Sequence, residues 1–143
     1  MNKIFEDEFM DIQTGIISLC LELADDNTEK IYIYGSLEEH STSFNAFFQV
    51  NGEVKTLNKV VNNVDAIWEF LDLGESDLQK IREVCKQYQQ KRPTEIKIIY
   101  DCIKGTFEAK YKYESVCSAD TGLDSSDIFM DWVKEMEDTI KHI

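Results

Sequence analysis

The residues best suited to chemistry in this chain are its two histidines and four cysteines, since these side chains are common metal ligands and nucleophiles. His40 lies in the polar segment Glu38-Glu39-His40-Ser41, and His142 is the penultimate residue. A Glu/Glu/His cluster could ligate a metal ion, but no further ligand stands at metal-site spacing, so a solvated turn is the simpler interpretation. The cysteines form no CxxC pair; they are Cys20, Cys85, Cys102 and Cys117. We therefore expect no metal site and no Cys–His nucleophile pair.

Motifs for other ligands are also missing from the sequence. It has no Gly-rich phosphate loop and no GxSxG segment. The segment 120–127 carries Asp120, Asp124 and Asp127, but the acid spacing is wrong for a calcium loop and no Glu stands at the twelfth position. Helix capping explains Asp124 and Asp127 more simply. We therefore expect no cofactor, and an enzyme that uses carboxylates remains an alternative that a deep pocket with a raised carboxyl pKa would support.

The acids near the C-terminus form a more informative pattern. They recur at steps of three and four residues, at Asp124, Asp127, Asp131, Glu135 and Asp138. In a helix this spacing places them on one side. Between residues 114 and 138 there are eight acidic residues and one basic residue, Lys134. Like charges four residues apart destabilise a helix by about 0.2–0.5 kcal/mol per pair. The stripe is thus either a surface for a basic partner or a solvated face whose repulsion is tolerated.

A second acidic feature lies in a predicted late hairpin. A two-residue turn at Lys104-Gly105 would pair apolar residues across one face, namely Cys102 with Phe107, Tyr100 with Ala109, Ile98 with Tyr111 and Ile96 with Tyr113. We expect this face to pack on the core, with Phe107 and Tyr111 toward a helix. The same register sets Asp101 opposite Glu108, and opposed like charges weaken a strand pair. Lys110 could soften this repulsion, or the two acids could await a partner's Lys or Arg.

The overall charge limits the kinds of partner. Among 143 residues, 28 are Asp or Glu and 15 are Lys or Arg, which gives a formal net charge of −13. Direct binding to nucleic acid or to an anionic membrane is disfavoured, whereas a basic protein is a natural complement. Excess acid that only maintains solubility is the alternative. The sequence has no signal-peptide pattern and no apolar run of membrane-spanning length, so we expect a cytoplasmic protein with reduced thiols.

The helices that would position these acids follow from apolar periodicity. Steps of three and four residues predict helices over 3–24 and 125–142. The region 63–91 reads as helical in two pieces, interrupted at Gly74, with a new start at Ser76.

The strands follow from alternating patterns and turn signals. They are predicted at 31–34, 43–50, 53–57, 96–103 and 106–113. Gly35 is expected to end the first strand, and a bulge at Gly52 to set Val50 against Val54. Because hairpins rather than crossovers join the strands, the sequence predicts a single domain over 1–143 of the α+β class, with an antiparallel sheet and helices packed on one face.

The chain resembles the YezG/EsaG-like immunity proteins over about residues 3 to 140. The matching features are Glu29-Lys30-Ile31-Tyr32-Ile33-Tyr34, Phe44 to Phe48, the helix that ends near Arg82, Gly105-Thr106-Phe107, Tyr111-Lys112-Tyr113 and Trp132. Members of this family are antitoxins of secreted bacterial toxins, many of which are nucleases. The resemblance implies that this chain neutralises a toxin in the cytosol of the producing or a sibling cell.

The sequence therefore predicts an immunity protein that is not an enzyme and that binds a basic toxin domain, in our prediction a nuclease. The predicted contact residues are Asp127, Asp131, Glu135, Asp138, Asp101 and Glu108. Two other acidic surfaces are alternatives, the turn at Glu38-Glu39-His40 and the first helix at Glu6-Asp7-Glu8-Asp11. An acidic adaptor or scaffold that binds another basic protein is the alternative function, and the oligomeric state stays open.

Overall fold

The computed structural model describes residues 4–117 and 122–141, and these residues contain one five-stranded antiparallel sheet. Its strands are β1 (Thr28–Glu38), β2 (Ser41–Val50), β3 (Glu53–Thr56), β4 (Glu95–Asp101) and β5 (Thr106–Lys112). Their order across the sheet is β3-β2-β1-β4-β5, so β1 lies at the centre between β2 and β4. The predicted α+β class with an antiparallel sheet of hairpins is confirmed.

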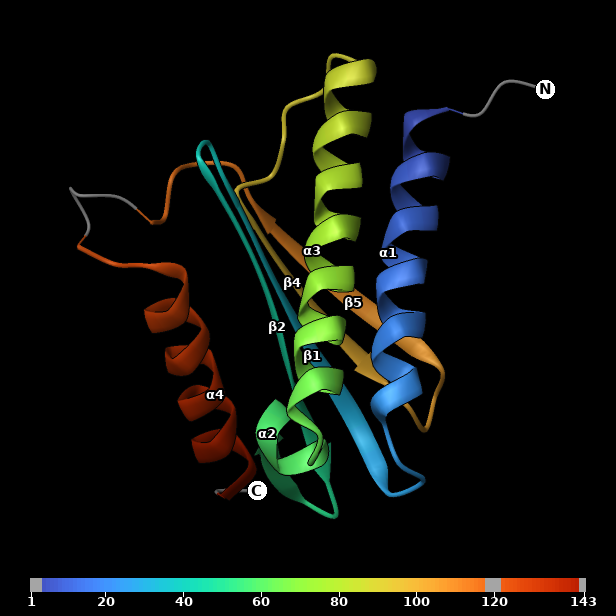
Figure 1. The fold of residues 1–143 in the computed structure, drawn as a ribbon, viewed down its shortest axis with the longest axis vertical. Helices are drawn as coiled ribbons and strands as arrows, with labels where there is room; N and C mark the ends of the chain where they lie inside the picture. The colour runs from blue at the N-terminus through green and yellow to red at the C-terminus, as the bar shows by residue number, and fades with distance from the viewer. Residues whose placement is uncertain (1–3, 118–121, 142–143) are drawn as a thin grey trace.

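The described helices are α1 (Phe5–Leu23), the short α2 (Leu57–Val60), α3 (Val64–Gln87) and α4 (Ser125–Lys141). α1 and α3 lie side by side on one face of the sheet, while α4 lies apart from them (Figure 1). The alternating strand residues Ile31/Ile33 and Tyr32/Tyr34 pack in two separate clusters, and α4 belongs to the second. The prediction that the helices pack on one face therefore holds for α1 and α3 and is wrong for α4.

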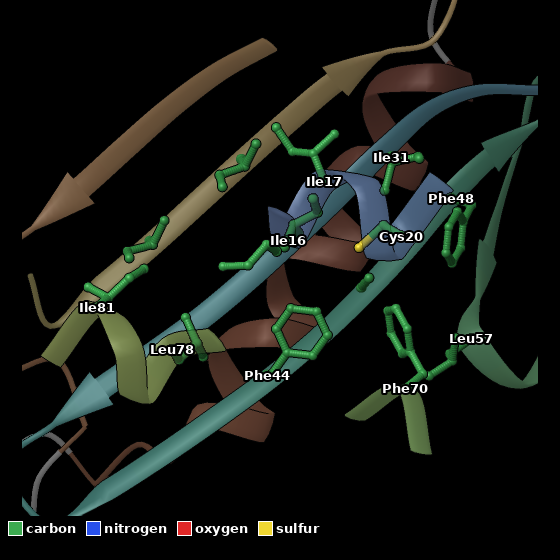
Figure 2. Close-up of a cluster of buried hydrophobic side chains, with 14 of the residues drawn as sticks. Ile16, Ile17, Cys20, Ile31, Phe44, Phe48, Leu57, Phe70, Leu78 and Ile81 are labelled. Carbon is green, nitrogen blue, oxygen red and sulfur yellow. The ribbon is translucent and has the colours of Figure 1, made fainter. Parts of the chain in front are cut away.

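The main core fills the space between the sheet and the pair α1 and α3. Figure 2 shows Ile16, Ile17 and Cys20 of α1 directed at the strands, with Phe44 and Phe48 of β2 beside them. Cys20 is fully buried, and burial raises the pKa of its thiol well above the ordinary value. Cys20 is thus a packing residue, as its place on an apolar face predicts.

The second core attaches α4 to the opposite face through aromatic rings. Tyr32 and Phe47 stack with ring centroids 4.5 Å apart. Trp132 meets both rings edge-on, at 5.7 Å from Tyr32 and 5.1 Å from Phe47. Edge-to-face and offset stacked pairs are the favourable arrangements for aromatic side chains. β1 and β2 are therefore apolar on both faces, which is why both faces need a helical cover.

α3 is a single continuous helix, so the predicted interruption at Gly74 is wrong. Asn63 caps its start by accepting hydrogen bonds from the N–H groups of Asp65 and Ala66. Gly74 is buried in the middle, where a Cβ atom would lie 2.0 Å from Cδ2 of Phe44. The glycine is needed because α3 closely approaches β2 there, and the helix tolerates the residue's poor propensity.

The first hairpins also differ in detail from the sequence prediction. β1 does not end at Gly35 but continues through it, and an added Cβ there would lie 2.9 Å from Leu78. At the second turn, Asn51 and Gly52 both have positive φ, at 52° and 77°. These angles give a plain two-residue turn that pairs Val50 with Glu53, so the predicted bulge is wrong. In this register Val50 joins the main core and Val54 the second core.

The late hairpin is shifted by two residues from its predicted register. β4 ends at Asp101 and β5 begins at Thr106, and Tyr100 pairs with Phe107. A shift of two keeps every side chain on its predicted face, because strand residues alternate with a period of two. The expectation that Phe107 and Tyr111 face a helix is confirmed, since both pack against the main core and the Tyr111 ring lies 5.7 Å from that of Phe9 in α1.

Candidate protein-binding surface

The acidic stripe predicted near the C-terminus lies on the outer side of α4. The four members that lie within α4 are exposed, at Asp127, Asp131, Glu135 and Asp138. The side chains of Phe129, Trp132 and Val133 on the same helix are buried against the sheet. With 100° between successive residues, the acids point away from the sheet and into solvent. The stripe is therefore accessible to a partner over most of the length of α4.

The first residue of the stripe has a structural role as well. The Asp127 N–H donates to the Asp124 carboxylate at 2.9 Å, and the Asp124 N–H donates to the Asp127 carboxylate at 3.2 Å. This reciprocal arrangement resembles a capping box and fixes the start of α4. The prediction that helix capping explains both residues is thus confirmed, while Asp120 of the same segment lies outside the described residues.

The rest of the stripe is electrostatically unbalanced. Within the described part of the chain, no ion pair involves Asp131, Glu135 or Asp138, although Lys134 is exposed on the same helix. Three acidic side chains thus repel one another at steps of three and four residues. That repulsion costs a few tenths of a kcal/mol per pair, and an approaching cation would relieve it.

Asp101 does not face Glu108, which corrects the predicted like-charge pair. It lies opposite Thr106, and its carboxylate accepts hydrogen bonds from the N–H groups of Ile103 and Lys104, both at 3.0 Å. The hydrogen bond from Lys104 is the largest cause that lowers the pKa of Asp101 below its ordinary value. Asp101 therefore stabilises the hairpin turn, and no unfavourable pair is held ready for a partner.

Glu108 is exposed on β5, where it lies opposite Ile99. It shares a sheet face with α4, but α4 covers β2 and β3 at the other end of the strand order. Lys97 of β4 lies between these regions, with its ammonium 5.2 Å from the centre of the Trp132 ring. The structure therefore does not bring Asp101 and Glu108 together with the stripe of α4 into one acidic patch.

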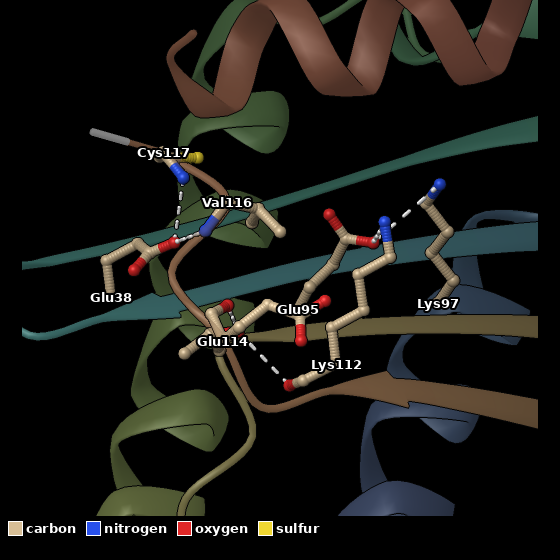
Figure 3. A network of polar contacts seen from close by, with 8 residues as sticks. Glu38, Glu95, Lys97, Lys112, Glu114, Val116 and Cys117 are labelled. Carbon is tan, nitrogen blue, oxygen red and sulfur yellow. Dashed lines mark hydrogen bonds and ion pairs between the residues drawn. The ribbon is translucent and has the colours of Figure 1, made fainter. Parts of the chain in front are cut away.

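Glu38 has a structural role, although the sequence interpretation placed it in a solvated turn. It is only 8% exposed, and its carboxylate accepts hydrogen bonds from the N–H groups of Val116 and Cys117 at 2.9 Å each (Figure 3). Ser115 adds a hydroxyl donor at 3.2 Å. Charge-assisted bonds to a buried carboxylate are the stronger kind. Glu38 therefore anchors the chain segment that leads from β5 toward α4.

The turn at Glu38-Glu39-His40 is thus only in part the solvated surface that was expected. Glu39 and His40 are highly exposed, and Nε2 of His40 lies 3.9 Å from Oε1 of Glu39. Arg82 of α3 holds the base of the turn by donating to the main-chain oxygen atoms of Glu38 and Ser41. Among the described residues, no group of three or more His, Cys, Asp or Glu side chains is placed to hold a metal ion, and His142 lies outside those residues.

A second buried acid, Glu95, opens β4 with an exposed fraction of 2%. The ammonium groups of Lys97 and Lys112 each lie 3.8 Å from one of its oxygens (Figure 3). Its other oxygen, the Tyr34 hydroxyl and the Ser36 hydroxyl are buried without a hydrogen-bond partner in the described residues. Burial, followed by the charge of Glu95, raises the pKa of Tyr34 well above the ordinary value. Nothing in the sequence periodicity separates Glu38 and Glu95 from surface acids.

Family models and curated proteins give no relative of this chain. No protein-family model matches the chain, and no curated protein matches it significantly. Among the residues that the structure describes, no helix combines the length and apolarity needed to cross a bilayer.

Proposed function

We propose that this protein is a non-catalytic immunity protein of the cytoplasm that binds and neutralises a basic toxin domain, with a nuclease as the favoured toxin. The observation that carries the proposal is the exposed acidic stripe of α4, whose members Asp131, Glu135 and Asp138 have no ion pair within the described residues. The resemblance to the YezG/EsaG-like family supports the same function independently of the charge.

Physical complementarity is the reason to favour a nuclease. A nuclease must carry positive charge on the surface that holds its phosphate-rich substrate. An acidic helix can dock on that surface, exclude the substrate and gain a fast, electrostatically steered association. The net charge of −13 adds a long-range attraction toward any such partner. This inhibition needs no cofactor and no catalytic group.

The geometry of α4 supports this role in a second way. The aromatic residues Phe129 and Trp132 fix the helix to the sheet, and Asp124 and Asp127 fix its first turn. A rigid acidic surface loses little conformational entropy when a partner binds. Asp101 and Glu108 lie away from α4, so we now assign them at most a peripheral part in the contact.

The proposal predicts that a large secreted protein is encoded beside this gene, and it is tested by co-expressing this chain with the C-terminal domain of that protein. We expect that domain alone to stop growth and the pair to restore it, with a stoichiometric complex recovered on purification. A bystander acidic protein of similar size and charge is the control and should not rescue growth. An adaptor protein would instead give no rescue, and a rescue that needs no physical complex would contradict the proposed mechanism.

A further inference from the structure

The outer edge of β5 is open. β5 is the last strand in the order β3-β2-β1-β4-β5, and no strand lies beyond it in the described residues (Figure 1). The N–H of Cys102 donates to Glu29 and the C=O of Thr94 accepts from Leu37, so the main-chain groups of even-numbered β4 residues face β1. The odd-numbered residues of β4 therefore bond to β5, through Lys97 with Lys110 and Ile99 with Glu108.

This alternation determines which groups of β5 point outward. They are the N–H and C=O groups of Phe107, Ala109 and Tyr111, and no hydrogen bond to these main-chain groups occurs within the described part of the chain. The edge contains no Pro and no bulge, which are common devices for blocking strand addition. Exposed charges remain as the protection, at Glu108, Lys110 and Lys112.

These charges become complementary when a second copy of β5 lies antiparallel across a two-fold axis at Ala109. Glu108 of each copy then faces Lys110 of the other copy, which gives two such pairs. Outside the strand, Lys104 of each copy faces Glu114 of the other. On the opposite face Phe107 faces Tyr111, also twice. Opposite-charge and aromatic cross-strand pairs are both stabilising. We propose that this protein forms a two-fold symmetric dimer by pairing the two β5 edges about Ala109, which joins the two sheets into one.

Neighbouring registers lack this complementarity. An axis at Glu108 would set the two copies of Glu108 against each other, and an axis at Lys110 would do the same with Lys110. An axis at Tyr111 would set Lys110 against Lys112. Each of these arrangements opposes like charges directly, which is destabilising. The register with its axis at Ala109 avoids like-charge pairs. In this register all three outward residues also form main-chain hydrogen bonds to the second copy.

A groove beside the edge offers space for the side chains of the second copy. It has a volume of about 590 Å³ and lies between α1, β5 and the segment before β4, with Phe9, Met10, Pro93, Tyr111 and Tyr113 in its wall. In the proposed register Phe107 of the second copy lies across from Tyr111, next to this groove. The partly exposed aromatic and methionine side chains would then lose contact with water.

The dimer is independent of the proposed toxin-binding function. α4 contacts β2 and β3, and β5 is at the far side of the strand order, so both acidic stripes would remain free. Each copy carries a charge of −13, and this long-range repulsion opposes association. At about 0.15 M ionic strength the screening length is ~8 Å, so close pairs such as Glu108–Lys110 outweigh distant repulsion there.

The test measures the molar mass of the full chain by light scattering across a concentration series at this ionic strength. We expect twice 16.6 kDa at high concentration. The substitutions Glu108→Lys and Lys110→Glu should each raise the dimer dissociation constant about tenfold or more, because each creates two like-charge pairs. An equimolar mixture of these two variants should form a heterodimer, and the double variant should dimerise like the unmodified chain.

A second variant separates pairing from folding. Ala109→Pro removes an N–H that points outward, so the sheet within one copy loses no hydrogen bond, while the dimer loses two. It should be folded and monomeric. A monomer at all concentrations, a dimer that Ala109→Pro leaves intact, or a mixture of charge variants with no gain in mass would each overturn the proposal. Amide hydrogen exchange is a further check. Protection of the β5 amides only after a toxin domain is added would also overturn the proposal.

Discussion

Gly74 illustrates how one residue can carry a different meaning in sequence and in structure. A glycine inside a helical pattern commonly signals a break, and the pattern around it predicts two helices. In the structure the helix continues, and the Phe44 ring occupies the space where a side chain would be. Sequence periodicity reports which face of a helix is buried but not how closely a neighbouring strand approaches it.

This interpretation predicts that Gly74→Ala destabilises the protein by about 1–3 kcal/mol through overpacking, although alanine is the better helix former. Gly15→Ala is the matched control, since nothing lies within 4 Å of a Cβ at that helical position. It should stabilise the protein by about 0.5–1 kcal/mol. Urea unfolding of both variants gives the two free energies. Equal stabilisation by both would show that α3 does not approach β2 as described.

The acidic residues also show that a sequence pattern does not report contacts with distant segments of the chain. Sequence spacing correctly placed the α4 stripe on an exposed face and assigned Asp124 and Asp127 to a cap. It could not identify Glu38 and Glu95 as buried, because their burial depends on segments distant in sequence, at Ser115 to Cys117 and at Lys112. It also paired Asp101 wrongly, since the length of the turn determines the register and the carboxylate of Asp101 helps to fix that turn.

At the scale of elements, the positions of helices and strands followed from periodicity, whereas their layering did not. α4 was predicted as an amphipathic helix, and the structure confirms its extent and its apolar side. Its position on the opposite face depends on β1 and β2 being apolar on both sides, through Tyr32, Tyr34 and Phe47. A run of consecutive apolar strand residues indicates burial on both faces, but it does not identify the covering helix.

The docking of α4 is tested by the two tryptophans of the chain. Trp132 is 5% exposed between two aromatic rings of the sheet, whereas Trp68 on α3 is 62% exposed. We expect Trp132→Ala to lower the free energy of unfolding by about 3–5 kcal/mol. Trp68→Ala should change it by less than about 0.5 kcal/mol. Chemical denaturation monitored by circular dichroism measures both. Similar effects of the two substitutions would contradict the second core.

At the scale of the whole molecule, charge is distributed unevenly over an otherwise ordinary fold. The net charge of −13 is not spread as balanced pairs, because acids outnumber bases on the exposed side of α4, while the uncovered strands carry both Glu108 and lysines such as Lys110 and Lys112. One sheet would thus offer two different surfaces, an acidic helix for a basic partner and a mixed-charge edge for a second copy. Composition indicated the first kind of surface, and only the strand order reveals the second.

The most direct test of the central claim is the association rate of the toxin domain with the double variant Asp131→Lys, Glu135→Lys. We expect that rate to fall about tenfold or more at low salt and to depend less on salt, because steering charges are reversed. Thermal stability should stay unchanged or rise slightly, because the new attractions to Asp127 and Asp138 outweigh the new repulsion between position 131 and Lys134, while 131 and 135 remain a like-charged pair. The control reverses two exposed acids of α3 with the same charge change, Glu69→Lys with Asp72→Lys, and should have a much smaller effect. If the α4 variant associates as fast as the control and with unaltered salt dependence, the stripe is only a solvated face and the interface lies elsewhere.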